Sequence, residues 1–370
     1  MQKFDKNSLW RMVKPWFDVF DGPLSLIIFF IMLVGLITLY SASIDFPGRM
    51  QGQLRNIAVA LVVMWIAASI PPQTLMRFAV PIYAVGVALL LGVFAFGMVK
   101  KGARRWLNVG IVIQPSEIMK IAMPMMLAWF FQKREGTLSW KEYLIAAILL
   151  AVPAALIIKQ PDLGTALLVL GTGCYVIFLA GLSWKTIAGL LISACASMPL
   201  IWSVLHDYQR QRVMTLLDPS ADPLGKGFHI IQSTIAVGSG GILGKGWLQG
   251  TQGHLHFIPE RTTDFIFAVY SEEFGLIGNL VLMALYLLLI ARGLMIAANA
   301  PTIFTRLLAG AIALMFFNYA FVNMGMVSGI LPVVGVPLPF MSYGGTALVT
   351  LGLGAGILMS ISRHRKLVQT

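Results

Sequence analysis

The residues best suited to chemistry in this chain are carboxylates that stand beside cations at the ends of long apolar runs. Asp264 follows the stretch PERTT and begins such a run. Thr262 or Thr263 can cap a helix here, which places Asp264 in the first turn, where the helix dipole favours an acid. One explanation is therefore structural. The other is a carboxylate at a membrane-surface cleft that accepts a proton from a sugar hydroxyl group.

A second group of charges stands at the start of two other apolar runs. Glu117 and Lys120 are three residues apart, so they share one helix face and can pair. Pro115 suits the first helical turn, and Ser116 can cap it. Asp162 either caps the next helix or joins Glu117 and Lys120 in a polar cluster beneath the outer surface. A charge inside a span costs roughly 2.5–3.5 kcal/mol on insertion scales, so it usually has a function, although a structural ion pair is the alternative.

A cationic segment with Lys100, Lys101, Arg104 and Arg105 lies just outside an apolar run. Guanidinium groups match the oxygens of phosphate, so this segment can capture a phosphate or diphosphate. A solvated loop with general headgroup contacts is the alternative. The stretch GSGGILGKG (238–246) approximates a P-loop, but its first glycine and its terminal Ser or Thr are missing, so it does not predict a nucleotide site.

The elements that position these residues are membrane-spanning helices. Of 370 residues, 58% are hydrophobic and 11% are charged, which is too little charge to cover a soluble protein. A span needs about 20 mostly apolar residues, and lipid leaves no alternative to helix for such runs. We expect an all-α, polytopic membrane protein with about ten transmembrane helices. The apolar runs lie at about 24–42, 56–70, 78–97, 116–131, 143–158, 165–181, 186–205, 264–291, 304–327 and 343–361.

The distribution of Lys and Arg predicts the orientation. Short connections are richer in these residues on the side of the termini, which places both termini in the cytoplasm. Residues 1–22 are then a cytoplasmic leader, because the first run is longer than that of a signal peptide. Residues 206–263 form one long extracytoplasmic loop between helices seven and eight. No separate domain is visible, so residues 1–370 form a single membrane domain. The net charge of +12 fits such a protein without a nucleic-acid partner.

Two further features limit the chemistry. Cys174 and Cys195 both lie in apolar runs, which argues against a disulfide framework and against a zinc site. Residues 332–346 hold three prolines and paired glycines, which exclude a regular helix. Non-helical backbone at membrane depth is tolerated where it lines a cavity, so this segment is expected to form a shaped re-entrant loop.

Several of these stretches together resemble the SEDS family (shape, elongation, division, sporulation). One departure is Thr263, where close relatives are expected to have His before the aspartate; Asp264 is intact, but a titratable neighbour is missing. The ten-span layout also fits. The stretches that carry the resemblance are KGARRWLNVG, QPSEIMKIAMP, QPDLGTALLV, HDYQRQRV, DPLGKGFHIIQSTIAVGSGGILGKGWLQGTQ, PERTTDFIFAV and GILPVVGVPLPFMSYGG.

The resemblance implies a peptidoglycan glycosyltransferase of the bacterial inner membrane that serves cell elongation and rod shape. Such enzymes polymerise lipid II into β-1,4 glycan strands on the periplasmic face and release undecaprenyl diphosphate. Asp264 matches the family's essential aspartate, assigned as general base of an inverting transfer. Glu117, Lys120 and Asp162 match polar positions linked to the cavity beneath it. The leaving diphosphate needs charge stabilisation, and the candidate residues are Lys101, Arg104, Arg105, Arg210, Arg212 and Lys245.

The same resemblance suggests partners and leaves two alternatives. The expected partners are lipid II, the growing glycan strand and a class B penicillin-binding protein, which is a transpeptidase of the elongation machinery. The lipid tail is expected to stay in the bilayer, in a groove between helices. No obligatory cofactor and no metal-ligand cluster is evident, although a divalent cation can assist the diphosphate. A lipid II flippase also suits many spans with buried charges, and a non-catalytic scaffold is the third hypothesis.

Overall fold

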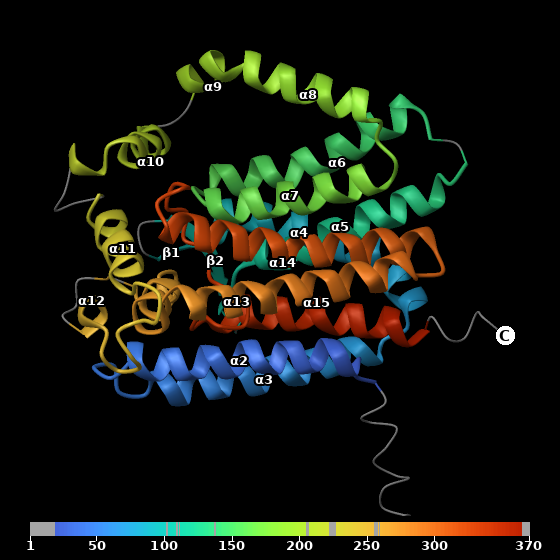
Figure 1. Cartoon of the computed structure of the whole chain (residues 1–370). Coiled ribbons are helices and arrows are strands. Elements are labelled where there is room, and N and C mark those ends of the chain that lie inside the picture. Colours follow the sequence, from blue (N-terminus) through green and yellow to red (C-terminus); the bar gives the residue numbers. More distant parts are fainter. Residues whose placement is uncertain are drawn as a thin grey trace, which may run out of the picture.

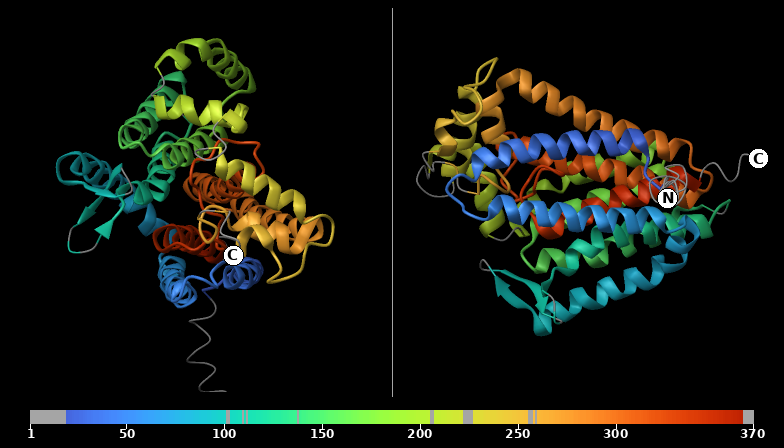
Figure 2. Two further views of the ribbon diagram at one scale, coloured as in Figure 1. Left: turned by 90° about the vertical axis from the view of Figure 1, so that its left-hand side faces the viewer. Right: turned by 90° about the horizontal axis from the view of Figure 1, so that it is seen from below.

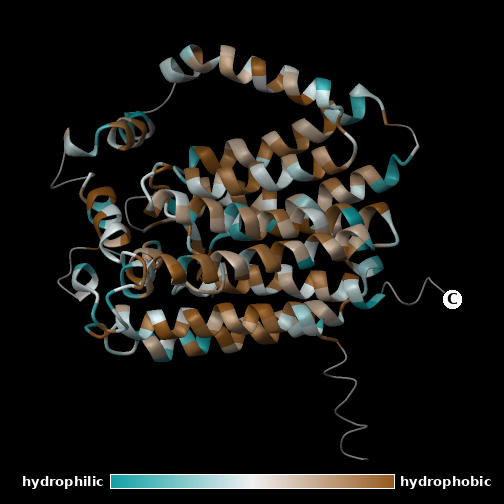
Figure 3. Cartoon of the chain, in the orientation of Figure 1, coloured by the Kyte–Doolittle hydropathy of each residue, from teal (hydrophilic) through white to brown (hydrophobic). Residues whose placement is uncertain are grey.

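The chain folds into a bundle of long helices with short helices gathered at one end (Figures 1 and 2). The computed structural model describes residues 19–364 except 101–102, 109, 111, 137, 205–206, 222–226, 255–257 and 259. Most of the expected leader therefore lies outside the described residues. Hydrophobic residues predominate along the helices, and hydrophilic residues collect toward their ends (Figure 3). This distribution suits a bundle that is immersed in a bilayer.

Each of the expected apolar runs is helical over most of its length. Among the described residues, seven helices are long and apolar enough to cross a membrane, so the chain is a multi-pass membrane protein. These seven are α2 (Gly22–Ala42), α3 (Arg49–Ser69), α4 (Pro72–Phe96), α6 (Trp140–Lys159), α13 (Ile266–Ala298), α14 (Ile303–Val327) and α15 (Gly345–His364). The other runs form α5 (Pro115–Lys133), α7 (Leu163–Leu179) and α8 (Trp184–Ala196).

The segment between α4 and α5 departs from the all-α fold that the sequence predicted. It forms a small antiparallel sheet in the order β1-β2-β3, in which Leu107 pairs with Ile113. Val99, Trp106 and Val112 belong to residue types that favour strands, and the segment is too short for another span. The all-α expectation is wrong here. The strands are β1 (Met98–Lys100), β2 (Ala103–Asn108) and β3 (Val112–Ile113).

The seventh expected run is interrupted. α8 ends at Ala196, and α9 (Met198–Val204) follows after Ser197. Pro199 lies in the first turn of α9, where its missing N–H is tolerated but cannot continue the ladder of α8. The expected long loop is itself largely helical and lies at one end of the bundle (Figure 1). It contains α10 (Asp207–Leu217), the 3₁₀ turn η1 (Pro219–Ala221), α11 (Phe228–Ser239) and α12 (Thr251–His254).

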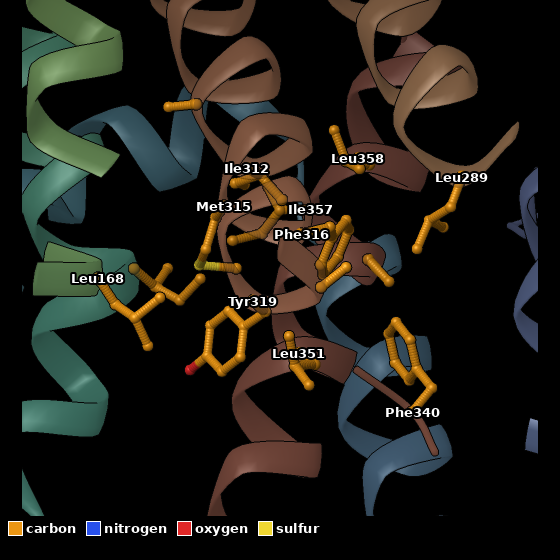
Figure 4. Close-up of a cluster of buried hydrophobic side chains, with 14 of the residues drawn as sticks. Leu168, Leu289, Ile312, Met315, Phe316, Tyr319, Phe340, Leu351, Ile357 and Leu358 are labelled. Carbon is orange, nitrogen blue, oxygen red and sulfur yellow. The ribbon is translucent and has the colours of Figure 1, made fainter. Parts of the chain in front are cut away.

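Small residues let the helix backbones approach closely. A Cβ atom at Gly352 of α15 would lie 2.8 Å from the carbonyl oxygen of Ala60 on α3, and one at Gly356 would overlap the carbonyl oxygen of Met64. Close backbone packing of this kind replaces the hydrophobic effect as the force that holds helices together in lipid. The α14 helix lies centrally, with its side chains packed among α7, α13 and α15 (Figure 4). Labelled side chains of this core are Leu168, Met315, Phe316, Tyr319, Phe340 and Leu351.

The two described ends of the chain meet at the end of the bundle opposite α10–α12. Asp21 caps α2 by accepting a hydrogen bond from the Leu24 amide at 3.0 Å. It also accepts bonds from Arg292 of α13, at 2.6 and 3.0 Å, and from the Ser362 hydroxyl of α15 at 2.8 Å. We call this group, formed by Asp21, Arg292 and Ser362, the Asp21 junction. It places the start of α2 and the end of α15 on the same side of the bundle.

Candidate functional site

Asp264 lies in a turn that directly precedes α13, formed by residues 260–265. The helix begins at Ile266 and has no side-chain cap. The Thr263 hydroxyl instead donates to the backbone carbonyl of Glu260 at 3.1 Å and to its carboxylate at 3.0 Å. The expected threonine cap is therefore wrong, because both threonines belong to the turn. Asp264 stands just outside the helix, where its half-buried side chain is presented by loop backbone.

The turn is tied to the proline-rich loop between α14 and α15 (residues 328–344). The Ser342 hydroxyl donates to the Thr263 carbonyl at 2.7 Å, and the Tyr343 amide donates to the Thr262 carbonyl at 2.9 Å. The loop is non-helical, as expected from its prolines and glycines. Two successive carbonyls before Asp264 are thus fixed by one loop.

Asn323 of α14 fixes the carbonyl of Asp264 itself. Its Nδ2 donates to the Asp264 carbonyl at 2.8 Å and to the Val336 carbonyl at 2.7 Å. The side chain is fully buried, and its Oδ1 has no hydrogen-bond partner. Gly335 lies against the carboxylate, since a Cβ atom there would be 3.3 Å from Asp264 Oδ2. The position of the carboxylate thus depends on α14 and on the proline-rich loop together.

A polar cluster surrounds Asp162 at the start of α7. Asp162 caps the helix by accepting a bond from the Thr165 amide at 3.3 Å, and it also accepts a bond from Gln114 Nε2 at 3.0 Å. Arg105 lies 3.7 Å from the carboxylate, and it donates to the Pro161 carbonyl at 2.6 Å. The capping role of Asp162 is confirmed, but its polar partners in this cluster are Gln114 and Arg105 rather than Glu117 and Lys120.

Glu117 and Lys120 form the expected ion pair on one face of α5. Lys120 Nζ lies 2.5 Å from Glu117 Oε1, and the lysine is 3% exposed. Its ammonium group lies 5.1 Å from the centre of the Tyr319 ring, and Thr350 donates to the other Glu117 oxygen at 3.1 Å. Such a buried pair needs these added partners to offset the loss of hydration.

The start of α5 differs from the expectation in one detail. Pro115 occupies the first turn as predicted, but the N-cap is Gln114. Ser116 is buried, and its hydroxyl has no hydrogen-bond partner. The expected Ser116 cap is wrong, because the proline moves the helix start one residue earlier.

A cavity of about 620 Å³ lies among α3, α4, α5, α15 and β3. Its walls are mainly aliphatic side chains such as Val59, Ile118 and Leu353. A few polar groups line it, and they include Gln114 and Glu117. Apolar walls with a few convergent polar groups are typical of a ligand site. The polar lining residues are Asn56, Gln114, Glu117, Thr346 and Thr350.

The proline-rich loop joins this polar cluster to the Asp264 turn. Asp264 is not among the residues that line the cavity. The carbonyl of Val334 lies close to Gly164 of α7, since a Cβ atom there would be 2.7 Å from it. The next residue, Gly335, contacts the Asp264 carboxylate. Two neighbouring loop residues therefore lie near the two parts of the site. Val334 lies near the start of α7, which Asp162 caps, and Gly335 lies near Asp264.

The candidate cations that the structure describes have their contacts away from Asp264. Arg104 donates to the Phe94 carbonyl at 3.0 Å. Arg210 donates to the carbonyls of Trp202 and Ser203, at 3.0 and 2.7 Å. Among the described candidates, Arg105 is linked to the cavity. It lies beside Asp162, which accepts a hydrogen bond from the cavity-lining residue Gln114. Lys101 and the side chain of Arg212 lie outside the described residues.

Lys245 is held elsewhere, on the broken helix α13. Its ammonium group lies 2.6 Å from Glu272, a carboxylate that is fully buried. Glu272 also accepts bonds from the Thr251 amide at 2.9 Å and the Gln252 amide at 3.0 Å. Its neighbour Glu273 is also buried. The environment of Lys245 is that of a structural ion pair.

Residues 240–246, called the glycine loop below, are built into the break in α13. The break is at Gly275, with φ 63° and ψ −160°. An unbroken helix would bond the amides of Leu276 and Ile277 to the carbonyls of Glu272 and Glu273. The glycine loop supplies the partners instead. The bonds are Lys245 N to Glu272 O (3.0 Å), Gly246 N to Glu273 O (3.0 Å), Leu276 N to Gly241 O (2.9 Å) and Ile277 N to Ile242 O (3.1 Å).

Sequence reasoning missed the residues that hold the Asp264 turn. Asn323 offered one signal, as a lone amide inside an apolar run. Ser342 offered none, because its bond to Thr263 spans 79 residues. Nothing in the sequence distinguishes Arg261 from an exposed cation of a loop. In the structure it is 3% exposed and pairs with Asp45 at 2.6 Å. It also donates to the carbonyls of Ala42 and Gly253.

Within the part of the chain that the structure describes, no group of three or more His, Cys, Asp or Glu residues could hold a metal ion.

The chain belongs to the FtsW/RodA/SpoVE family of cell cycle proteins, whose family model matches residues 23–367. This confirms the family expected from the motifs. The chain is 53% identical over 366 residues to the peptidoglycan glycosyltransferase MrdB of Escherichia coli K12, with 98% of each chain covered. It is 36% identical to the stage V sporulation protein E of Bacillus subtilis, with 94% of this chain and 98% of that protein covered.

Solved structures share the fold. One chain of a peptidoglycan synthase complex that coordinates polymerization and crosslinking is 34% identical, with a TM-score of 0.81 over 95% of this chain and 99% of that one. The rod shape determining protein RodA of Thermus thermophilus is 28% identical, with a TM-score of 0.71 over 94% of this chain and 97% of that one.

Proposed function

We propose that this chain polymerises lipid II into β-1,4-linked glycan strands, with Asp264 as the general base. The class of activity expected from the sequence, a peptidoglycan glycosyltransferase, is confirmed through the relatives that carry this name. The observation that carries the assignment of the base is the fixed turn. Hydrogen bonds from the side chains of Asn323 and Ser342 and from the Tyr343 amide hold three successive backbone carbonyls and present a half-buried carboxylate.

The proposed step is a single displacement at the donor sugar. The acceptor 4-hydroxyl oxygen forms a bond to the anomeric carbon as the bond from that carbon to the diphosphate oxygen breaks. The hydroxyl proton passes to the Asp264 carboxylate, and undecaprenyl diphosphate leaves with the bonding electrons. Attack from the face opposite the leaving group inverts the α configuration to β. General base catalysis of this kind typically contributes 10²–10⁴-fold to the rate.

The polar cluster and the cavity suit the lipid diphosphate. Arg105 is partly exposed, and its guanidinium group can stabilise the charge of the leaving diphosphate. The apolar cavity that begins at Gln114 and Glu117 suits the polyprenyl chain. The buried Glu117–Lys120 pair and Asp162 fix the positions of Glu117 and Gln114, the polar residues at which the cavity begins. A divalent cation can add to the charge stabilisation, but the proposal does not require one.

The proposal includes an orientation. Ten membrane crossings, with both termini in the cytoplasm, place the Asp264 turn and α10–α12 at the periplasmic side of the inner membrane. The Asp21 junction supports this arrangement, because it brings the two described chain ends together at the opposite side. A class B penicillin-binding protein is the proposed partner, and the likeness to a chain of a peptidoglycan synthase complex supports it.

The test is polymerisation of lipid II by the purified protein, alone and with the transpeptidase. Wild type is expected to give glycan ladders on a gel, and Asp264→Asn is expected to lower the rate at least 100-fold, because an amide cannot accept the proton. Asp207→Asn is the matched control, since the Asp207 side chain is 95% exposed and lies in α10. It should leave the ladders unchanged.

Two outcomes would reject the proposal. Undiminished ladders from Asp264→Asn would remove the base assignment. Absence of polymer even with the transpeptidase, together with lipid II translocation in liposomes, would favour the flippase hypothesis. A scaffold predicts that polymer depends on the partner alone, with Asp264 dispensable.

A further inference from the structure

A second pocket, of about 330 Å³, lies at the end of the bundle opposite the Asp264 turn. Four helix ends enclose it: the starts of α4 and α14 and the ends of α5 and α15. Its volume falls at the lower end of the range for sites that hold small ligands. We call it the helix-end pocket. Its main lining residues are Pro72, Met76, Lys133, Thr302, Phe304 and His364.

The helix-end pocket carries positive charge that the chain does not neutralise. Lys133 is exposed and has no hydrogen-bond or ion-pair partner among the described residues. His364 Nδ1 lies 2.8 Å from the Ser360 carbonyl. A carbonyl cannot donate, so Nδ1 carries the hydrogen, and Nε2 is the nitrogen left for a ligand. Glu135, the acid closest in sequence to Lys133, accepts a bond from Gln132 at 2.9 Å.

The backbone at the helix-end pocket brings dipole ends of both signs, because α4 and α14 begin here and α5 and α15 end here. The positive charge of the pocket therefore comes from its side chains. Gln132 Oε1 accepts a bond from the Phe304 amide at 2.9 Å, which locks the end of α5 to the start of α14. The cationic rim is therefore held on rigid helices.

The helix-end pocket also has an apolar floor. Met76, Phe304 and Ile361 line it together with the two prolines Pro72 and Pro301. It opens at the level where the apolar helices end, which is the level of the lipid headgroups. A ligand here meets cations at the rim and hydrocarbon below, which is the chemistry of an amphiphile with an anionic head.

We propose that the helix-end pocket binds the phosphate headgroup of an anionic phospholipid from the leaflet opposite the Asp264 turn. The phosphate accepts a hydrogen bond from Lys133 Nζ and lies beside the His364 ring, and the glycerol backbone and upper acyl chains lie over Met76 and Ile361. Basic pockets between transmembrane helices recognise anionic headgroups in this way. The lipid bridges the ends of α4, α5, α14 and α15.

The test is native mass spectrometry of the full chain with phosphatidylglycerol or phosphatidylethanolamine of matched acyl chains. Wild type should bind one phosphatidylglycerol at least fivefold more tightly than phosphatidylethanolamine, because a cation near a lipid surface contributes about fivefold in affinity. Lys133→Gln combined with His364→Gln should abolish that preference. Lys185→Gln, an exposed cation at the start of α8 and outside the pocket, is the matched control and should keep it.

A third variant separates charge from shape. Met76→Trp fills the helix-end pocket without removing charge, and it should also lose the tight phosphatidylglycerol adduct, while its thermal unfolding in detergent verifies folding. An unchanged lipid preference in the Lys133/His364 variant would overturn the proposal. Displacement of the lipid by millimolar glycerol 1-phosphate would assign the pocket to a soluble phosphate instead. The readout is binding, so a negative result leaves the polymerisation mechanism untouched.

Discussion

Single residues position the candidate base through its backbone. Asn323 is a fully buried amide that donates to two carbonyls on different segments, those of Asp264 and Val336. Ser342 repeats this arrangement one residue earlier, at Thr263. Precise placement of a catalytic group matters for the rate, because a misplacement of about 1 Å can cost about 10²-fold. Asn323 is therefore a positioning residue for Asp264.

Replacement of Asn323 by Leu tests this role. Leu has a similar volume but no donor, so two buried carbonyls lose their partner, at about 1–3 kcal/mol each. We expect kcat for glycan polymerisation to fall at least tenfold, with the KM for lipid II nearly unchanged, because the cavity is not touched. A raised KM with unchanged kcat would contradict a positioning role. Thermal unfolding separates this effect from global unfolding.

Sequence reasoning at this scale reached the residues whose partners are close in the chain. The Glu117–Lys120 pair follows from a spacing of three residues on a helix, and the cap at Asp162 follows from the residue type. Asn323 and Asp264 are 59 residues apart, and no local pattern connects them. The contacts of Asp264 depend on tertiary packing of the proline-rich loop, which periodicity cannot predict.

At the scale of elements, backbone hydrogen bonds between the glycine loop and α13 stabilise the break in this helix. Two helical bonds that the break at Gly275 removes are replaced by four bonds to residues 241–246. Gly244 is essential to this fit. It has φ +81°, and a Cβ atom there would overlap the Glu273 carbonyl. Glycine is required here for two separate reasons, a left-handed backbone and a close approach.

The substitutions Gly244→Ala and Gly241→Ala separate these two reasons. Gly241 also has a positive φ, of +57°, but nothing lies within 4 Å of its Cβ position. Alanine at 241 should cost about 1 kcal/mol from the left-handed backbone alone. Alanine at 244 should cost about 2–4 kcal/mol, because the loop must also move off α13. Thermal unfolding in detergent measures both, and equal losses would contradict the close fit.

Sequence reasoning predicted the elements themselves better than their interruptions. Long apolar runs specify helices because lipid offers no other way to satisfy the backbone, and each expected run is helical. The breaks depend on local details. Pro199 separates α8 from α9, and the small sheet of β1, β2 and β3 occupies a segment that the sequence indicated only as a cationic loop. The break at Gly275 lies inside a run that the sequence predicted as one span, and it depends on a loop that docks against the helix from outside.

At the scale of the whole molecule, the Asp21 junction joins the two ends of the described chain. Burial raises the pKa of Asp21. Hydrogen bonds from Arg292, Ser362 and the Leu24 amide together lower it by more, so the pKa lies below the ordinary value of 3.8. Because the folded protein prefers the charged form, this carboxylate stabilises the fold above about pH 4. That stability is lost as the pH falls through the lowered pKa.

Asp21→Asn should therefore lower stability at neutral pH. An amide keeps some hydrogen bonds but loses the charge-assisted ones, so we expect a loss of about 1.5–3 kcal/mol. The loss should shrink as the pH falls below 4, because wild type then protonates Asp21 and approaches the variant. Thermal unfolding of both proteins between pH 7 and pH 3 measures this difference. A gap that is constant across this range would contradict the role of the charge.

The break in α13 has a consequence for how the protein is made. A span inserted as an independent helix closes its own backbone bonds within the bilayer. α13 cannot do so, because partners for its open carbonyls and amides lie in residues 241–246, upstream in the chain. Lipid supplies no substitute. In the proposed orientation the glycine loop lies on the periplasmic side, so it must cross the membrane before α13 can reach its final structure. The order of translocation during synthesis is then a condition for completing this helix.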